Sequence, residues 1–302
     1  MTFLLISQND IFSKVITSSI TEIEKNAKIH TSDFSLCKIR KTIKQFEKLS
    51  LILIFKEDNV NITSEELSTL SSITGFAVAK DILVLTNIKE LYNLSFLQKD
   101  SIVYLKTKNE FVNYIKQKYE SISLNDTKRS SKKKLLEKGI PFTPDCFGTY
   151  IAKDKTDICN LFISGGIDIN SRDENGTPMI NIAVRNDNEE LVKKFIKLGA
   201  DINAVSEDRG YTPVMDAVWR GNLELTKLFI KEGAELNTIN KEGQTNLVLA
   251  VGANKTKIIE ALAKAGADPD IIDQMGMSAY GYASLFKKEE ILSILEPYHK
   301  TL

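Results

Sequence analysis

Residues able to carry out acid–base, nucleophilic or metal chemistry are few and scattered in this sequence. The 302-residue chain has two histidines, His30 and His299, and three cysteines, Cys37, Cys146 and Cys159. Three widely spaced cysteines match neither a disulfide framework nor a zinc site, and the peripheral positions of both histidines make a Cys–His catalytic pair implausible. No glycine-rich loop followed by Lys-Ser or Lys-Thr is present to hold a phosphate group. The sequence therefore predicts no enzyme activity, no metal site and no cofactor.

The charge and hydropathy patterns favour a soluble, cytoplasmic protein. The 40 basic residues balance 40 acidic ones, so there is no overall attraction to nucleic acid. The longest apolar runs, such as Leu51–Phe55, are far shorter than the ~20 residues of a membrane-spanning helix. The apolar residues 1–7 lack the basic start of a leader, and we expect a strand there. Sparse cysteines indicate a reducing compartment, and the abundance of Lys, Ile and Asn is typical of a bacterial, AT-rich genome.

A block of about 33 residues is repeated in the second half of the chain. The sequence Gly-Ala-Asp, or a close variant, begins near Gly166, Gly199, Gly233 and Gly266, at spacings of 33, 34 and 33 residues. Apolar residues at helical spacing precede each copy, as in residues 191–196. A second, shorter helix is expected upstream of each of these, so every repeat contains two helices.

Each repeat also carries signals that start and end its helices. Thr177-Pro178 and Thr212-Pro213 suit the start of the first helix, and the glycine after the second helix suits a left-handed cap. These features resemble the ankyrin repeat, whose period is ~33 residues. The histidine of that family is replaced here, by Asn181, Met215 and Val248. The resemblance implies an all-α solenoid of about five repeats with degenerate capping repeats at both ends.

The resemblance also implies where a partner binds. Ankyrin repeats bind other proteins on a concave face, which is formed by the turn tips and by the first helix of each repeat. Aromatic and arginine side chains, which often dominate protein interfaces, occur at matching positions of this sequence. We therefore expect a protein–protein interaction module of a scaffold, adaptor or signalling protein. The expected partner-binding residues are Tyr211, Asp216, Trp219, Arg220, Arg185 and Asn186.

The first 121 residues show a different pattern, in which apolar runs alternate with helical stretches. Several runs have no polar interruption, as is typical of strands buried on both faces of a parallel sheet. Five βα units predict a flavodoxin-like, doubly wound domain. The expected strands are 3–7, 28–31, 51–55, 81–86 and 101–105, and the expected helices are 11–24, 34–49, 64–73, 88–97 and 110–119.

This first domain resembles the receiver domains of bacterial response regulators. Thr86 matches the receiver hydroxyl position, and Lys106 lies near the position of the receiver lysine. The acidic residues of the family are displaced, because Ser7 is followed by Gln and Asn, and Phe55 stands where a phosphate-accepting aspartate would end the third strand. We expect a receiver-like domain that is not phosphorylated. The alternative is a signalling switch in which this domain accepts phosphate, at Asp58, and regulates the repeats.

A polar and strongly basic stretch, residues 125–134, lies between the two halves. Its composition favours an exposed, mobile linker, although a basic run also suits an anionic surface. The sequence therefore predicts a receiver-like α/β domain at 1–121, a basic linker at 122–138 and an ankyrin-repeat domain at 139–302.

Overall fold

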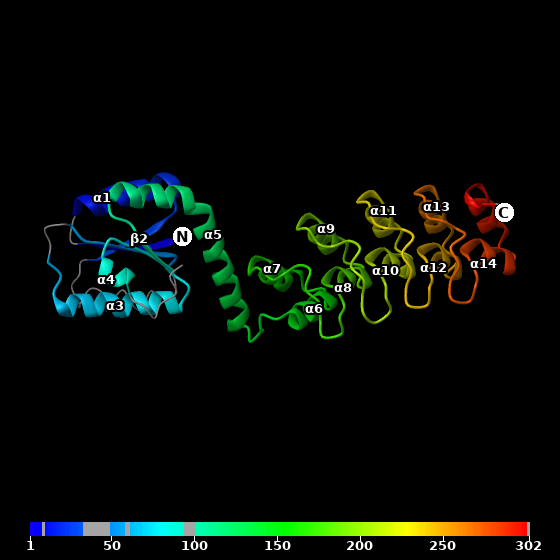
Figure 1. Cartoon of the computed structure of the whole chain (residues 1–302), viewed down its shortest axis with the longest axis horizontal. Coiled ribbons are helices and arrows are strands. Elements are labelled where there is room, and N and C mark those ends of the chain that lie inside the picture. Colours follow the sequence, from blue (N-terminus) through cyan, green and yellow to red (C-terminus); the bar gives the residue numbers. More distant parts are fainter. Residues whose placement is uncertain (8–9, 33–48, 58–60, 94–100, 301–302) are drawn as a thin grey trace. The chain divides into compact units, whose positions relative to one another are not determined.

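The computed structural model describes residues 1–7, 10–32, 49–57, 61–93 and 101–300, and these form two compact units. The unit Met1–Ser130 is α/β, and the unit Ser131–Leu302 is all-α (Figure 1). This confirms the predicted combination of a parallel α/β domain with a helical repeat domain. The helix expected at residues 34–49 falls almost entirely outside the described residues.

The first unit contains a five-stranded parallel sheet. Its strands lie in the order β2-β1-β3-β4-β5, and every neighbouring pair is parallel. This is the order of flavodoxin-like, doubly wound sheets. The strands are β1 (Thr2–Ser7), β2 (Lys28–Ser32), β3 (Leu51–Phe55), β4 (Leu83–Thr86) and β5 (Ile102–Tyr104).

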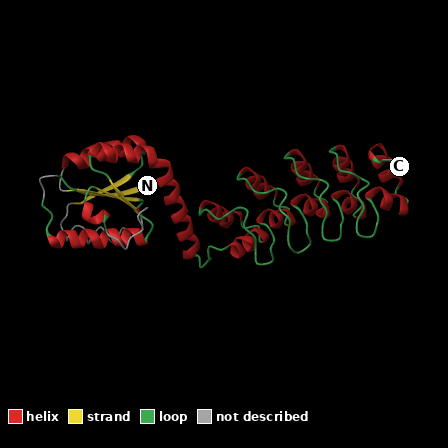
Figure 2. Cartoon of the chain, viewed as in Figure 1, coloured by secondary structure: helices red, strands yellow, loops and turns green. Residues whose placement is uncertain are grey.

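Helices cover both faces of this sheet, as Figure 2 shows. They are α1 (Asp10–Ile23), α3 (Ser64–Ala79), α4 (Lys89–Tyr92) and α5 (Lys108–Glu137). Successive side chains of a strand point to opposite faces, so β3 serves two apolar layers. Leu51 and Leu53 belong to the layer with the α1 and α5 side chains, and Ile52 belongs to the layer with those of α3. Burial on both faces explains why β3 has no polar residue.

Helix α5 corrects the prediction of a mobile linker. The sequence predicts a helix at 110–119 and an irregular segment at 122–138, but α5 is helical as far as Glu137. The polar segment is held at several points, although its exposed face is basic. Arg129 donates hydrogen bonds to the backbone oxygen of Leu49 and, at 2.8 Å, to Asp126. Leu135 is fully buried in the core of the second unit. The contact between Arg129 and Leu49 joins residues 80 positions apart, so composition alone did not predict it.

Five helix pairs make up the described part of the second unit. Each pair has a first, inner helix and a second, outer helix, and the inner helices of successive pairs contact each other. A short 3₁₀ helix, η3 (Glu296–Tyr298), follows the last pair. The pairs are α6 (Pro144–Ala152) with α7 (Thr156–Ser164), α8 (Met179–Arg185) with α9 (Glu189–Lys197), α10 (Pro213–Arg220) with α11 (Leu223–Lys231), α12 (Asn246–Gly252) with α13 (Thr256–Lys264), and α14 (Ala279–Leu285) with α15 (Glu289–Leu295).

The helix signals act largely as the sequence predicts. The Thr212 hydroxyl caps α10 by accepting a hydrogen bond from the backbone N–H of Met215 at 3.4 Å. The residue before α8, however, is Pro178 rather than Thr177, so this helix starts without a side-chain hydrogen bond at its cap. The glycines that follow the outer helices have positive φ angles, for example 85° at Gly199 and 84° at Gly233. This conformation favours glycine because it has no Cβ.

Asparagine side chains link successive repeats. Asn170, Asn203 and Asn237 each accept a hydrogen bond at Oδ1 from a backbone N–H of the following repeat, at 2.8, 2.9 and 2.9 Å. We call these residues the asparagine ladder. In the last repeat Asp270 takes the equivalent position, and it accepts a hydrogen bond from the backbone N–H of Lys300 at 2.8 Å. The segment after η3 therefore satisfies the acceptor that a further repeat would satisfy.

An aromatic cluster lies where β3 ends. The rings of Phe12 and Phe55 are stacked with their centres 3.9 Å apart, and Phe111 meets both of them edge-on at 5.6 Å. Phe12 and Phe111 are fully buried, and Phe55 is almost so. The cluster joins α1, β3 and α5, so it anchors one helical layer of the first unit to the sheet.

Replacing Phe55 with alanine tests this anchor. We expect Phe55→Ala to destabilise the first unit by about 3–5 kcal/mol, because it removes a buried ring and leaves a cavity. Hydrogen exchange of the β3 and β4 amides measures this loss in the full chain. Phe76→Ala is the matched control, because Phe76 lies in α3 and is partly exposed. Equal exchange rates in the two variants would contradict the anchoring role.

Candidate partner-binding surface

Trp219 is exposed but held in place. It lies near the end of the inner helix α10, and 53% of its surface is accessible. Its ring meets the ring of Tyr211 edge-on, with the centres 6.4 Å apart. Tyr211 is only 5% exposed, and the guanidinium of Arg209 lies 5.6 Å from its ring centre. A buried tyrosine therefore orients an indole whose remaining surface faces solvent.

A network of hydrogen bonds centred on Arg185 lies in the same part of the stack. Arg185 ends the inner helix α8, and its Nε is 3.0 Å from both carboxylate oxygens of Asp216 in the next repeat. Its two terminal nitrogens donate to Asp208 at 2.7 and 3.0 Å, and one of them also donates to Ser206 at 3.0 Å. Asn181 donates to Asp216 at 2.9 Å. One arginine thus holds two carboxylates of the following repeat.

Tyr211 and Asp216 do not fit the expectation that they contact a partner directly. Asp216 is 1% exposed, and its carboxylate is occupied by Arg185 and Asn181. The two residues instead position Trp219 and Arg185. Asn181 stands at the position of the family histidine, and it donates a hydrogen bond to the backbone oxygen of Tyr211 at 3.1 Å. It therefore links two repeats.

Burial and hydrogen bonding move the pKa values of the two carboxylates in opposite directions. Burial raises the pKa of Asp216, and the nearby Arg185 offsets only part of this effect. Partial burial would also raise the pKa of Asp208, but hydrogen bonds from Arg185 and Ser206 outweigh it and hold that pKa well below its usual range. Asp208 is therefore the partner that keeps its charge as the pH falls.

The other two expected residues are exposed but have intramolecular partners. Arg220 forms an ion pair with Asp187 of the preceding repeat, and its Nε is 3.1 Å from that carboxylate. The Asn186 side chain donates to the backbone oxygen of Ile182 at 2.8 Å. Both side chains are exposed, and they occupy equivalent positions in successive repeats.

The inner helices present one equivalent position per repeat, which we call the inner-helix row: Arg185, Trp219, Gly252 and Leu285. A Cβ built on Gly252 would meet no atom within 4 Å, so this position of the row has no side chain and is surrounded by open space. Leu285 and its neighbour Phe286 are both exposed. Neither residue was among the expected partner-binding residues, although the repeat register places both directly in line with Trp219 and Arg220.

The strand ends of the first unit hold an aromatic cluster at the position where a receiver domain would carry phosphate. Lys108, rather than Lys106, lies close to this cluster, 5.8 Å from the Phe55 ring centre and 3.3 Å from Glu57. Thr86 is buried, and its hydroxyl accepts a hydrogen bond from the backbone of Ile88 at 3.0 Å. Asp58, the alternative phosphate acceptor, lies outside the described residues. The receiver resemblance stays a prediction.

Comparison with known protein families assigns the repeats to a family. A family model described as ankyrin repeats (3 copies) matches residues 149–240 and 214–300. The chain therefore belongs to the ankyrin-repeat family.

The chain is also similar to an ankyrin repeat-containing protein of Treponema pallidum (strain Nichols). The two are 31% identical over 194 residues, which is 64% of this chain and 65% of the relative. The chain thus spans about 65% of that protein's length. The similarity is longer than the span of the family match, so it includes residues outside that match. In the part of the chain that the structure describes, no helix is long and apolar enough to cross a membrane.

Removing the buried carboxylate tests the Arg185 network. We expect Asp216→Ala to lower the free energy of unfolding of the repeat unit by about 3 kcal/mol, because it leaves part of a buried ion pair unmatched. Denaturant unfolding followed by Trp219 fluorescence measures the change, since Trp219 is the sole tryptophan of the chain. The exposed Glu224→Ala serves as control and should stay within about 0.5 kcal/mol of wild type. Equal free energies of unfolding for the two variants would show that the Arg185 network does not stabilise the repeat unit.

The low pKa of Asp208 gives a pH test. Its ionised form is favoured by folding, so its contribution to stability is present above the usual carboxyl pKa of ~3.9 and is lost as the pH falls toward its folded pKa. We expect the stability difference between wild type and Asp208→Asn to shrink between pH 5 and pH 3. Urea unfolding at both pH values measures it. A difference that stays constant would show that Arg185 does not stabilise this charge.

Proposed function

We propose that this chain is a cytoplasmic adaptor that binds a partner protein at the inner-helix row, with Trp219 as the main contact. Its ankyrin repeats make it a protein-interaction module. Trp219, Arg185, Asn186 and Arg220 form the proposed contact surface, and Leu285 extends it toward the last repeat. Tyr211 and Asp216 support this surface from beneath.

The exposed but oriented Trp219 carries the proposal. A large aromatic side chain that is fixed before binding loses little conformational entropy when a partner covers it. Tyr211 supplies this fixation through its edge-on ring contact. The open space at Gly252, the equivalent position of the next repeat, leaves room for a side chain of the partner. Tryptophan and arginine side chains are also the residues that most often dominate binding energy at interfaces.

The first unit is proposed to be receiver-like in shape and not to be phosphorylated. Phe55, at the end of β3, is packed between Phe12 and Phe111, and this packing supports a structural role for that position. A cytoplasmic location is supported by Cys146 and Cys159, which are both free thiols, 13 residues apart in neighbouring helices.

Truncating Trp219 tests the proposed function. We expect Trp219→Ala to reduce recovery of the partner at least about tenfold in pull-downs from the native cell extract, because an interface anchor of this kind contributes ~2 kcal/mol or more. Phe76→Ala is the control, since it removes another partly exposed aromatic ring from a different part of the chain. Partner recovery that is the same for wild type, Trp219→Ala and Phe76→Ala would reject Trp219 as the anchor.

A further inference from the structure

Positive charge is concentrated in the C-terminal part of α5 and the residue after it, positions 124–138, although the whole chain carries equal numbers of basic and acidic residues. Because α5 is helical as far as Glu137, this charge lies on a regular helical surface and not on an irregular linker. Two residues of the segment are acidic and six are basic: Lys128, Arg129, Lys132, Lys133, Lys134 and Lys138.

The two carboxylates of this segment are each bound to a basic neighbour. Asp126 accepts a hydrogen bond from Arg129 at 2.8 Å, and Glu137 lies 4.0 Å from the Lys133 ammonium. The other four lysines form no ion pair with any carboxylate in the part of the chain that the structure describes: Lys128, Lys132, Lys134 and Lys138. Four positive charges of the segment are therefore not offset by its own acidic residues.

Neighbouring segments do not offset this charge either. Residues 139–155, which follow the segment, contain two lysines and two aspartates. Arg129 also donates to the backbone oxygen of Lys80 at 3.5 Å, and there Lys80 and Asp81 bring one charge of each sign. Within the described ranges, the excess of positive charge therefore comes from α5 itself.

One side of α5 combines two of these lysines with two leucines. Leu124, Lys128, Lys132 and Leu136 follow one another at intervals of four residues, which places them on one helical face. Leu124 is 54% exposed and Leu136 is 74% exposed. We call these four residues the basic face of α5. At ~100° per residue, the two carboxylates of the segment fall on the opposite side of the helix.

Other side chains make the contacts that hold this part of the helix. Leu135 is fully buried, Ser131 is almost so, and Arg129 donates to the backbone oxygen of Leu49. On the basic face, the ammonium of Lys132 lies 4.7 Å from the centre of the Phe142 ring, which fixes that side chain at the surface. The fold therefore gives no reason for two leucines of this face to be exposed to water, where apolar surface is unfavourable.

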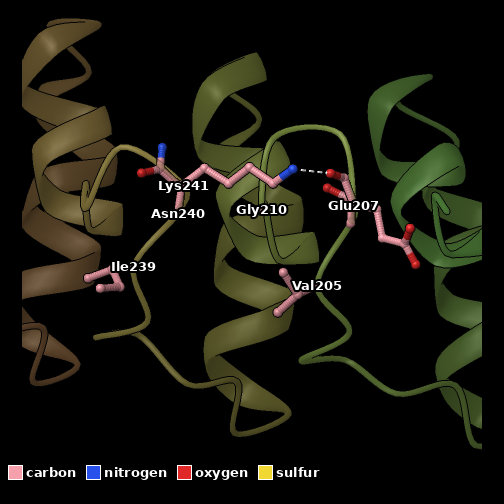
Figure 3. Close-up of a pocket in the computed structure, with 7 residues that line it drawn as sticks. Val205, Glu207, Gly210, Ile239, Asn240 and Lys241 are labelled. Atoms are coloured by element: carbon pink, nitrogen blue, oxygen red, sulfur yellow. Dashed lines mark hydrogen bonds between the residues drawn. The ribbon is translucent and has the colours of Figure 1, made fainter. Parts of the chain in front are cut away.

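The use of Lys241 in the repeats shows a contrast. Figure 3 shows its side chain extended from one hairpin to the next, beside an open pocket. Its ammonium donates there to the backbone oxygen of Glu207. The ammonium groups of Lys128 and Lys134 have no hydrogen bond or ion pair of this kind to any described residue. They are therefore available to anions from outside the chain.

Charge and apolar character together favour an anionic membrane as the occupant of the basic face. Lysine side chains near a membrane are attracted by anionic lipid headgroups. Leucine side chains can enter the boundary between headgroups and acyl chains, which removes their apolar surface from water. The phosphates of a nucleic acid also attract lysines, but they offer no apolar surface to cover the leucines.

We propose that α5 binds the surface of an anionic membrane through its basic face. Leu124 and Leu136 enter the headgroup region, and Lys128 and Lys132 meet the lipid phosphates around them. The other lysines of the segment add to the attraction from the sides of the helix. The helix lies on the membrane without crossing it. Because Trp219 takes no part in this binding, the inference does not depend on the proposed partner contact.

Binding of the full chain to lipid vesicles tests this proposal. The probes are vesicles of about 30% phosphatidylglycerol in phosphatidylcholine, and the control vesicles contain phosphatidylcholine alone. By co-sedimentation in about 0.1 M salt, we expect at least about tenfold stronger binding to the anionic vesicles, and weaker binding as the salt is raised. Equal binding to the two kinds of vesicle would overturn the proposal.

A charge variant locates the binding on α5. The triple variant Lys128→Gln, Lys132→Gln, Lys134→Gln should weaken binding to the anionic vesicles at least about tenfold. Circular dichroism verifies that each variant is folded. Equal binding by this variant and by the control would overturn the proposal, because the control loses the same net charge elsewhere. The control changes three exposed lysines of the outer helices to glutamine: Lys197, Lys231 and Lys257.

A leucine variant separates a membrane from a nucleic acid. Leu136→Ser should weaken vesicle binding at least about threefold, while Leu198→Ser, which changes a half-exposed leucine of the repeats, should not. Trp219→Ala should bind vesicles as wild type does, so loss of the partner contact is distinguishable from loss of membrane binding. Tighter binding to a duplex DNA than to anionic vesicles, unaffected by Leu136→Ser, would overturn the proposal, because the occupant would then be a nucleic acid.

Discussion

The packing of each helix pair against the next pair is the interaction on which the repeat unit depends. A single pair cannot enclose its apolar residues, so Phe147, Phe162, Phe195 and Phe229 are fully buried only because the pairs stack in order. The asparagine ladder adds a directional bond at each step, and the terminal segment completes it at Asp270. Stacking also aligns the surface side chains, because each repeat contributes one side chain at each equivalent position and these form rows along the stack.

This register explains how rows of side chains arise with different roles. In the inner-helix row, the Arg185 side chain forms hydrogen bonds that join two repeats. Trp219, at the equivalent position of the next repeat, is exposed. The same repeat geometry therefore produces a structural contact in one repeat and a free aromatic surface in the next. On the hairpins, Arg172 donates to the backbone oxygens of Gly176 and Val205, whereas the equivalent position holds an exposed aliphatic side chain in the next repeats.

Features set by short-range patterns were predictable from the sequence. The repeat spacing predicted the helix pairs, and the uninterrupted apolar runs predicted all five strands to within two residues at each end. Features set by contacts between distant residues were not. Arg129 bonds to Leu49 from 80 positions away, and this contact helps to extend α5 through a segment that looks like a linker. Aspartate is a residue type that usually lies on the surface. Asp216 is buried because Arg185, 31 positions earlier, binds its carboxylate. The repeat register could have predicted that Leu285 and Phe286 are exposed, because they align with Trp219 and Arg220, but the two residues were not among those expected at the surface.

The emission of Trp219 tests the central claim most directly, because it is the sole tryptophan and lies at the proposed centre of the partner surface. The titrant is a tryptophan-free region of the partner that co-purifies with the chain. Trp219 emission and its quenching by acrylamide are recorded before and after this region is added. If the partner covers Trp219, its emission shifts to shorter wavelength and acrylamide quenches it less in the complex. Unchanged emission and quenching at saturation would show that the partner binds elsewhere, and would contradict the account.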